Sequence, residues 1–273
     1  MKRLIQVLMI LSLSYSLFSQ TKMFISTTSG TDSVWLSDVK SIYFKTYLTL
    51  PTDSLVAYYP FNGTLQDSSS KKRNLTFQGG TLTYTTDRKG NSNGAVFMDG
   101  SSRLYNNSSI GLKSNGDATI SAWILPARYS VSGSNDRYTS IAIYDFSNER
   151  SIRLWTDSSG LGFPSLPIGN KLIAETLPTS GQQYDAYYLT NNTTTWMHAV
   201  SIIRSDSIEI WINGIKQQST KINGSGSYFS DGMSIGGNNS GNSSQHYKGK
   251  IDDVRFYSRA LSPAEILALY NDW

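Results

Sequence analysis

The 273-residue sequence contains no cysteine, which excludes disulfide bonds, thiolate metal sites and a cysteine nucleophile. Charged residues are also scarce, at 16% of the chain, and the formal net charge is only +4. Lys2 and Arg3 carry two of these charges, so the chain without its first residues has a net charge of +2. A charge this small and dispersed does not favour binding to nucleic acid.

The composition is that of a folded domain. Hydrophobic residues make up 38% and aromatic residues 12% of the chain, enough to fill a core and to exclude global disorder. Much of the remainder is serine, threonine, asparagine and glycine. This bias is typical of many short strands joined by polar turns.

The first 19 residues have the pattern of a secretory signal peptide. Lys2 and Arg3 form a basic start, and residues 4–18 are mostly apolar. A membrane anchor is the alternative, but serines interrupt the apolar run, which is shorter than the roughly 20 residues that a span needs. No later segment is apolar for long enough to span a bilayer. We expect bacterial-type export, cleavage after Ser19, and a secreted or cell-surface protein.

Residues 20–53 form a short preface to the main domain. Residues 23–28 and 33–36 predict two short strands around a glycine-containing turn, and residues 41–44 predict a third. Thirty residues bury little surface, so the sequence leaves open whether this piece folds independently. Pro51 marks the boundary, because proline and the residue before it interrupt regular pairing. The main domain is expected over residues 54–273.

Strand signals recur throughout the main domain. Residues 118–125 predict a strand that ends at Pro126, and residues 196–203 predict a strand buried on both faces. Residues 207–212 alternate apolar with polar residues and are followed by Asn213-Gly214 and a second strand. Asn-Gly between such runs predicts a hairpin, since both central residues of a type I′ turn need positive φ.

One helix is predicted, at the C-terminus. Ser262 and Glu265 form a capping box, Pro263 occupies the first helical position, and apolar residues follow at three-and-four spacing. Many strands and one helix predict an all-β fold: an antiparallel two-sheet β-sandwich of jelly-roll type with one short C-terminal helix and a small hairpin preface.

Several motifs follow one another in order over about residues 54–273. They are Val56-Ala57-Tyr58-Tyr59-Pro60-Phe61-Asn62-Gly63, Gly94-Ala95-Val96-Phe97-Met98-Asp99-Gly100, Thr119-Ile120-Ser121-Ala122-Trp123-Ile124, Trp196-Met197-His198-Ala199-Val200, Ile210-Trp211-Ile212-Asn213-Gly214 and Gly249-Lys250-Ile251-Asp252-Asp253-Val254-Arg255-Phe256-Tyr257-Ser258-Arg259-Ala260-Leu261-Ser262. Taken in this order, they resemble the laminin-G-like branch of the concanavalin A-like lectin and glucanase superfamily, and the segment at 249–262 is the most diagnostic part. The resemblance implies two stacked antiparallel sheets, frequently with a structural calcium ion, in modules that bind glycans or proteins.

Asp252 lies in this last motif. If Val254 and Phe256 face the core, a period of two puts Asp252 on the same face, where its charge needs a cation or hydrogen-bond donors. In the resembled fold the turn after the first strand comes near the last strand, so Asn62, Asp67 and Asp252 are candidate ligands of a calcium ion. Alternatively, Asp252 accepts hydrogen bonds from the backbone or from Arg255 or Arg259.

Candidate ligand-binding residues are aromatic, because sugar recognition favours flat rings beside amides and hydroxyls. Three polar segments rich in tyrosine and one outward strand position supply them. The candidates are Tyr129, Tyr138, Tyr184, Tyr187, Tyr228 and Trp211.

Catalysis is not expected. Glycosidases normally use two carboxylates, and the chain lacks the Glu-x-Asp-x-x-Glu strand motif of the glucanases with this fold. Glu209, beside Trp211, is the one glutamate placed where a sugar could reach it, and His198 is expected to be a core residue. We expect a secreted, non-catalytic module that binds an extracellular glycan. The alternatives are an adhesion or structural module that contacts a surface protein, and a divergent glycosidase.

Overall fold

The computed structural model describes residues 22–27, 30–35, 49–108, 117–127, 138–144, 152–157, 170–176, 183–223, 232–237 and 246–272. The chain divides into two compact units, residues 1–47 and 48–273. In the first unit, β1 (Lys22–Thr27) and β2 (Gly30–Trp35) pair antiparallel, with Lys22 opposite Trp35. The two expected strands are therefore present. The expected leader at 1–19 and third strand at 41–44 lie outside the described residues.

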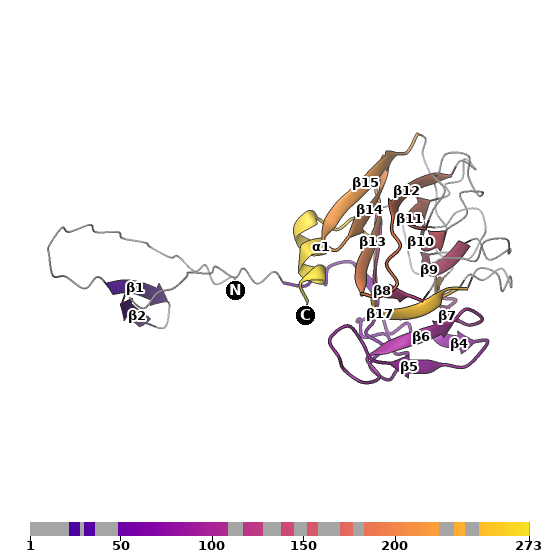
Figure 1. Cartoon of the computed structure of the whole chain (residues 1–273). Helices are drawn as coiled ribbons and strands as arrows, with labels where there is room; N and C mark the ends of the chain where they lie inside the picture. Colours follow the sequence, from indigo (N-terminus) through magenta and orange to yellow (C-terminus); the bar gives the residue numbers. More distant parts are fainter. Residues whose placement is uncertain are drawn as a thin grey trace. The chain divides into compact units, whose positions relative to one another are not determined.

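The second unit contains two antiparallel sheets (Figure 1). The larger sheet has the order β15-β14-β13-β8-β17-β6-β5, with β3 paired to β17, and the smaller has the order β12-β11-β10-β9-β16-β7-β4. The larger sheet comprises β3 Leu55–Tyr59, β5 Thr83–Thr85, β6 Ala95–Asp99, β8 Ala118–Pro126, β13 Met197–Ile203, β14 Ser207–Ile212, β15 Ile215–Lys221 and β17 Lys248–Tyr257. The smaller comprises β4 Thr76–Gln78, β7 Arg103–Asn106, β9 Tyr138–Tyr144, β10 Ile152–Asp157, β11 Lys171–Thr176, β12 Tyr184–Leu189 and β16 Met233–Ile235. The predicted two-sheet sandwich is confirmed.

The hydrophobic core lies between the two sheets. Alternate residues of each strand enter it, as Ile120 and Ile124 of β8 and Leu154 of β10 do. The intervening residues of β8, β13 and β14 are also mostly buried, and every residue of β13 is buried, as predicted. The outer face of the larger sheet must therefore be covered as well.

The C-terminal helix α1 (Pro263–Tyr270) provides this cover. Its capping box joins Ser262 to Glu265 as the sequence predicts. Ile266 and Leu269 pack with Val200, Trp211 and neighbouring residues in a second apolar cluster. Figure 1 shows α1 on the side of β13–β15 that faces away from β9–β12. No helix in the part of the chain that the structure describes is long and apolar enough to cross a membrane.

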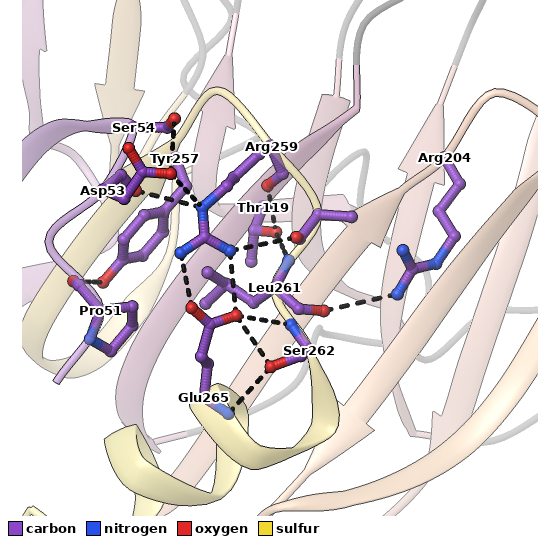
Figure 2. Close-up of polar contacts among 11 residues, drawn as sticks. Pro51, Asp53, Ser54, Thr119, Arg204, Tyr257, Arg259, Leu261, Ser262 and Glu265 are labelled. Atoms are coloured by element: carbon purple, nitrogen blue, oxygen red, sulfur yellow. Dashed lines mark hydrogen bonds and ion pairs between the residues drawn. The ribbon is translucent and has the colours of Figure 1, made fainter. Parts of the chain in front are cut away.

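Arg259 forms hydrogen bonds both with Asp53, at the start of the second unit, and with Glu265 of the C-terminal helix (Figure 2). Its guanidinium donates to both carboxylate oxygens of Glu265, at 2.9 and 2.6 Å, and to the backbone oxygen of Asp53 at 3.2 Å. The hydrogen bonds from Arg259 lower the pKa of Glu265 to about 2. Arg259 belongs to the segment at 249–262. This segment therefore connects β17 to α1 and is also hydrogen-bonded to the start of the unit at Asp53.

The turn between β14 and β15 has the conformation predicted from the sequence. Asn213 and Gly214 have φ values of 52° and 78°, the positive angles that a type I′ turn requires. The two strands pair antiparallel from Ser207 opposite Lys221 to Ile212 opposite Ile215. The predicted hairpin is confirmed.

Asp252 is not on the face that the sequence pattern predicted. Val254 and Phe256 do enter the core, but the pairing of β17 with β8 shifts between Asp252 and Arg255. This β-bulge contains Asp253, whose φ is 49°. The extra residue places Asp252 opposite Trp123, on the outer face of the larger sheet. The expectation of a core-facing Asp252 is therefore wrong, because a bulge breaks the period of two.

Candidate functional site

Three adjacent strands of the smaller sheet align charged side chains in a row. Arg153 of β10 is opposite Glu175 of β11, which is opposite Asp185 of β12. Directly opposite residues of antiparallel strands point to the same side of the sheet. Neighbouring residues such as Leu154 and Ala174 enter the core, so this row lies on the outer face.

Two further rows follow on the same side, two residues along each strand. Together the three rows form what we call the β10–β12 face. Its members are Arg153, Glu175 and Asp185 in the first row, Trp155, Ile173 and Tyr187 in the second, and Asp157, Lys171 and Leu189 in the third.

Lys171 and Asp157 form a tight ion pair in the third row. Their side chains lie 2.7 Å apart and are 0% and 1% exposed. Because a buried charge is costly unless it is paired, each neutralises the other. This row contributes little net charge to the face.

Glu175 is less well compensated. Its side chain is 2% exposed, and Oε1 lies 3.4 Å from Nη1 of Arg153. Within the described ranges, Oε2 of Glu175 has no hydrogen-bond partner. Burial raises the pKa of Glu175 to about 8, against the opposing effect of Arg153 and with a further increase from Asp185. At neutral pH this carboxyl group is therefore mostly protonated.

Asp185 lies beside Glu175 and is half-buried. Burial raises its pKa to about 6, although hydrogen bonds from Gln183 and the charge of Arg153 oppose the shift. Nε2 of Gln183 donates to both carboxylate oxygens, at 2.9 and 2.8 Å. Two carboxyl groups of unequal acidity thus lie side by side.

The face becomes more exposed towards β12. Trp155 is 3% exposed and has the guanidinium of Arg153 5.7 Å from its ring centroid, whereas Tyr187 is half-buried and Leu189 is 49% exposed. The backbone N–H of Tyr187 donates to the side chain of Gln218 on β15 at 2.6 Å. The exposed part of the face is therefore held in place by the other sheet.

The aromatic candidates predicted from the sequence are scattered. Tyr187 belongs to the β10–β12 face, and Tyr138 lies opposite Asp157 at the start of β9, although its side chain is outside the described residues. Tyr184 is 5% exposed in the core, where its hydroxyl donates to the backbone oxygen of Asn223. Tyr129 and Tyr228 lie outside the described residues.

Trp211 and Glu209 do not form an open surface. Both are on the outer face of the larger sheet as expected, but α1 covers that face and they are 7% and 6% exposed. Trp211 Nε1 donates to Glu209 at 2.8 Å. The prediction that Trp211 meets a ligand is wrong, because a helix some fifty residues later in the chain packs on it.

His198 is a core residue, as the sequence analysis expected. It is 0% exposed, and its Nε2 lies 2.8 Å from the hydroxyl of Ser121. Burial, together with the charges of Arg255 and Arg88, lowers the pKa of His198 to about 3. This histidine is neutral at physiological pH and out of reach of a substrate.

The carboxylate of Asp67, a candidate calcium ligand, is occupied by donors from the protein. Oδ1 accepts from the backbone N–H groups of Tyr58 and Ser69, at 2.9 and 2.7 Å. Oδ2 accepts from the Ser69 hydroxyl and the backbone N–H of Arg73, both at 2.8 Å. Asn62, the second candidate, is exposed.

The third candidate ligand, Asp252, accepts a 2.6 Å hydrogen bond from Nη1 of Arg88. Asp252 is thus paired with an arginine, but with neither Arg255 nor Arg259, the partners considered from the sequence. The described residues contain no group of three or more His, Cys, Asp and Glu side chains able to hold a metal ion. Asn62, Asp67 and Asp252 as arranged do not fit a calcium ion.

The β10–β12 face, apart from Tyr187, was missed by sequence reasoning. A signal was present, because Arg153, Trp155 and Asp157 alternate with apolar or small residues, as do Lys171, Ile173 and Glu175. This period of two assigns each set to one side of a strand. The alternation does not show the register in which β10 and β11 pair, so it could not predict that the two sets lie side by side.

The family model Laminin_G_3, described as the concanavalin A-like lectin/glucanases superfamily, matches residues 99–267, more than half of the chain. The chain belongs to this family. The match confirms the resemblance drawn from the sequence motifs. No curated protein matches the chain.

Solved structures share the fold at low identity. Domain 4 of AbnA, a GH43 extracellular arabinanase from Geobacillus stearothermophilus, in complex with arabinotriose, is 20% identical, with a TM-score of 0.58 over 80% of this chain and 98% of that chain. The binding domain of Paraclostridial Mosquitocidal Protein 1 is 18% identical, with a TM-score of 0.60 over 81% and 52%. A structure of botulinum neurotoxin type C, whose cell entry depends on interaction with two ganglioside molecules, is 14% identical, with a TM-score of 0.61 over 81% and 51%. This chain spans about half of the two toxin chains.

Proposed function

We propose that this protein is an exported, non-catalytic carbohydrate-binding module and that the β10–β12 face is its glycan site. The observation that carries the proposal is the accessible edge of this face on β12, where the half-buried side chains of Asp185 and Tyr187 lie two residues apart on one side of the strand. Sugars present apolar ring faces and a rim of hydroxyl groups. A site for them combines aromatic surface with a few fixed polar groups.

The structural neighbours support this class of ligand. One neighbour with the same fold was solved with arabinotriose, and another comes from a neurotoxin whose cell entry depends on gangliosides. The N-terminal pattern of basic and apolar residues supports export. The burial of Glu175, whose side chain is 2% exposed, supports binding over hydrolysis, because a catalytic carboxyl group must reach the scissile bond.

A glycan array with the purified protein tests the proposal. Replacing Tyr187 by Ala removes the accessible ring and should weaken binding roughly tenfold, which corresponds to about 1.4 kcal/mol. Tyr105→Ala is the matched control. Tyr105 is a half-buried tyrosine on β7, a strand of the same sheet that lies outside the β10–β12 face and is separated from it by β9 and β16. Circular dichroism of both variants checks that the sandwich is intact.

Three outcomes would contradict the proposal. They are absence of binding to any glycan, equal losses in both tyrosine variants, and hydrolysis of a bound oligosaccharide. Capture of a surface protein through a site that Tyr187→Ala does not affect would instead support the adhesion alternative.

A further inference from the structure

Among the described strands, β12 is the end strand of the smaller sheet, and side chains of β15 form hydrogen bonds with its backbone. The hydroxyl of Thr220 donates to the backbone oxygen of Asp185, and Oε1 of Gln218 accepts from the backbone N–H of Tyr187, both at 2.6 Å. The edge of an end strand otherwise presents unpaired N–H and C=O groups. The two side chains therefore take the place of a further strand at these two residues.

Both side chains come from the core-facing side of β15. In the pairing with β14, Gln218 is opposite Ile210 and Thr220 is opposite Ile208. Both isoleucines enter the core, and directly opposite residues of antiparallel strands point to the same side of the sheet. Alternation would place apolar residues at positions 218 and 220. The hydrogen bonds to β12 account for the polar side chains that are found there instead.

The two residues of β12 that are held in this way are those on which the proposed site depends. Asp185 and Tyr187 are half-buried and lie two residues apart, so their side chains point to the same side of the strand. Their backbone is tied to the other sheet before any ligand is present. Binding to a segment that is already ordered avoids the entropic cost of ordering it.

We propose that Thr220 and Gln218 are positioning residues of the glycan site, which hold β12 in its binding conformation. The inference rests on the proposed function, because it names residues that act on the same face. Neither side chain has to touch the glycan. Loss of either hydrogen bond should weaken binding by roughly two- to tenfold, the range expected for one such bond.

Two substitutions of Thr220 separate its hydroxyl from its shape. Thr220→Val keeps the shape of the side chain and removes the donor, whereas Thr220→Ser keeps the donor. Thr220→Val should therefore weaken binding by roughly two- to tenfold, and Thr220→Ser should retain the affinity of the wild type. The probe is the oligosaccharide that binds most tightly on the array and whose binding Tyr187→Ala weakens. Titration calorimetry measures the dissociation constant of each variant.

Gln218→Met tests the second bond, because methionine keeps the length of the side chain but lacks the carbonyl oxygen. It should weaken binding of the same oligosaccharide by roughly two- to tenfold. In the protein without glycan it should also accelerate hydrogen exchange of the Tyr187 amide, which loses its acceptor. Gln217→Met, at the exposed neighbouring residue of β15, is the matched control and should change neither quantity.

The results separate the inference from the proposed function. Unchanged affinity in Thr220→Val and Gln218→Met overturns the inference while Tyr187-dependent glycan binding still stands. Equal losses in Thr220→Val and Thr220→Ser also overturn it, because they would assign the effect to packing. Absence of binding to every glycan on the array overturns both. If Thr220→Val does not fold, the comparison of Gln218→Met with Gln217→Met decides.

Discussion

Buried carboxyl groups on the outer faces of the two sheets differ in how closely arginine side chains pair with them. On the larger sheet, Arg88 lies 2.6 Å from both Asp252 and Asp253, and Arg255 lies 3.5 Å from Asp253. Burial would raise the pKa of Asp253, but the charges of Arg255 and Arg88 outweigh it and hold that pKa below its usual value. The neighbouring Asp252 differs, because burial and the charge of Asp253 raise its pKa to about 7 against the opposing effect of Arg88.

On the β10–β12 face, burial outweighs the one cation near Glu175. Glu175 has one cation at 3.4 Å, an oxygen without a partner in the described ranges, and a raised pKa. The first arrangement lies on the sheet face that α1 covers, and it too contains buried nitrogens without a partner among the described residues, Nε of Arg88 and Nη1 of Arg255. The contrast therefore lies in the cations near each carboxyl group, because Asp253 has two arginines within 4 Å and Glu175 has one among the described residues.

The largest effect is expected from Arg88→Ala on the larger sheet. The substitution leaves Asp252 and Asp253 adjacent, buried and without their shared cation, at a cost of about 3–5 kcal/mol in the free energy of unfolding. Lys89→Ala is the neighbouring control, because Lys89 is 32% exposed in its side chain and should change stability by less than about 0.5 kcal/mol. Urea unfolding measures both. Equal losses of unfolding free energy in the two variants would contradict the view that the ion pairs of Arg88 stabilise this face.

The cover of the larger sheet is tested at α1. Leu269 is fully buried, so Leu269→Ala should cost about 2–5 kcal/mol, whereas Leu267, 41% exposed on the same helix, should cost less than about 0.5 kcal/mol when replaced by Ala. Thermal and urea unfolding compare the two variants. A small effect of Leu269→Ala would mean that the helix does not stabilise this face.

Glu175 should make stability depend on pH. Its pKa is raised from 4.5 in the unfolded chain to about 8 in the folded protein, beside Arg153 and Asp185. Between these pH values the folded state binds more protons than the unfolded state, so stability falls as pH rises from about 4.5 to 8. Glu175→Gln should flatten this decline, measured as melting temperature against pH, and Asp206→Asn, at an exposed aspartate in the turn between β13 and β14, should not. Parallel curves for wild type and Glu175→Gln would contradict the assigned burial.

The smallest effect is expected from calcium. Protein donors already occupy both oxygens of Asp67, and Arg88 binds Asp252. The melting temperature in millimolar calcium should therefore equal that in EDTA, since a ligand stabilises a protein only by binding its folded state. An increase abolished by Asp67→Ala would restore the calcium hypothesis.

Features set by local chemistry were predictable from the sequence. The turn at Asn213-Gly214 depends on two residues, the start of α1 depends on Ser262 and Glu265, and the doubly buried strand at 197–203 is a continuous apolar run. Each contains its own signal within a few positions.

Features set by distant partners were not predictable. The bulge at Asp253 reversed the face of Asp252, and the arrival of α1 buried Trp211. The row of Arg153, Glu175 and Asp185 depends on the register of three strands, which alternation alone does not fix. The β10–β12 face exists only when the three strands pair in this register, and the sequence shows only the side chains of each strand separately.

Hydrogen exchange of backbone amides, with and without the glycan that binds most tightly on the array, tests the central claim most directly. We predict slower exchange in β10, β11 and β12 when the glycan is present, and unchanged exchange in α1. Slower exchange confined to other segments, with β10–β12 unaffected, would contradict the assignment of this face as the binding site.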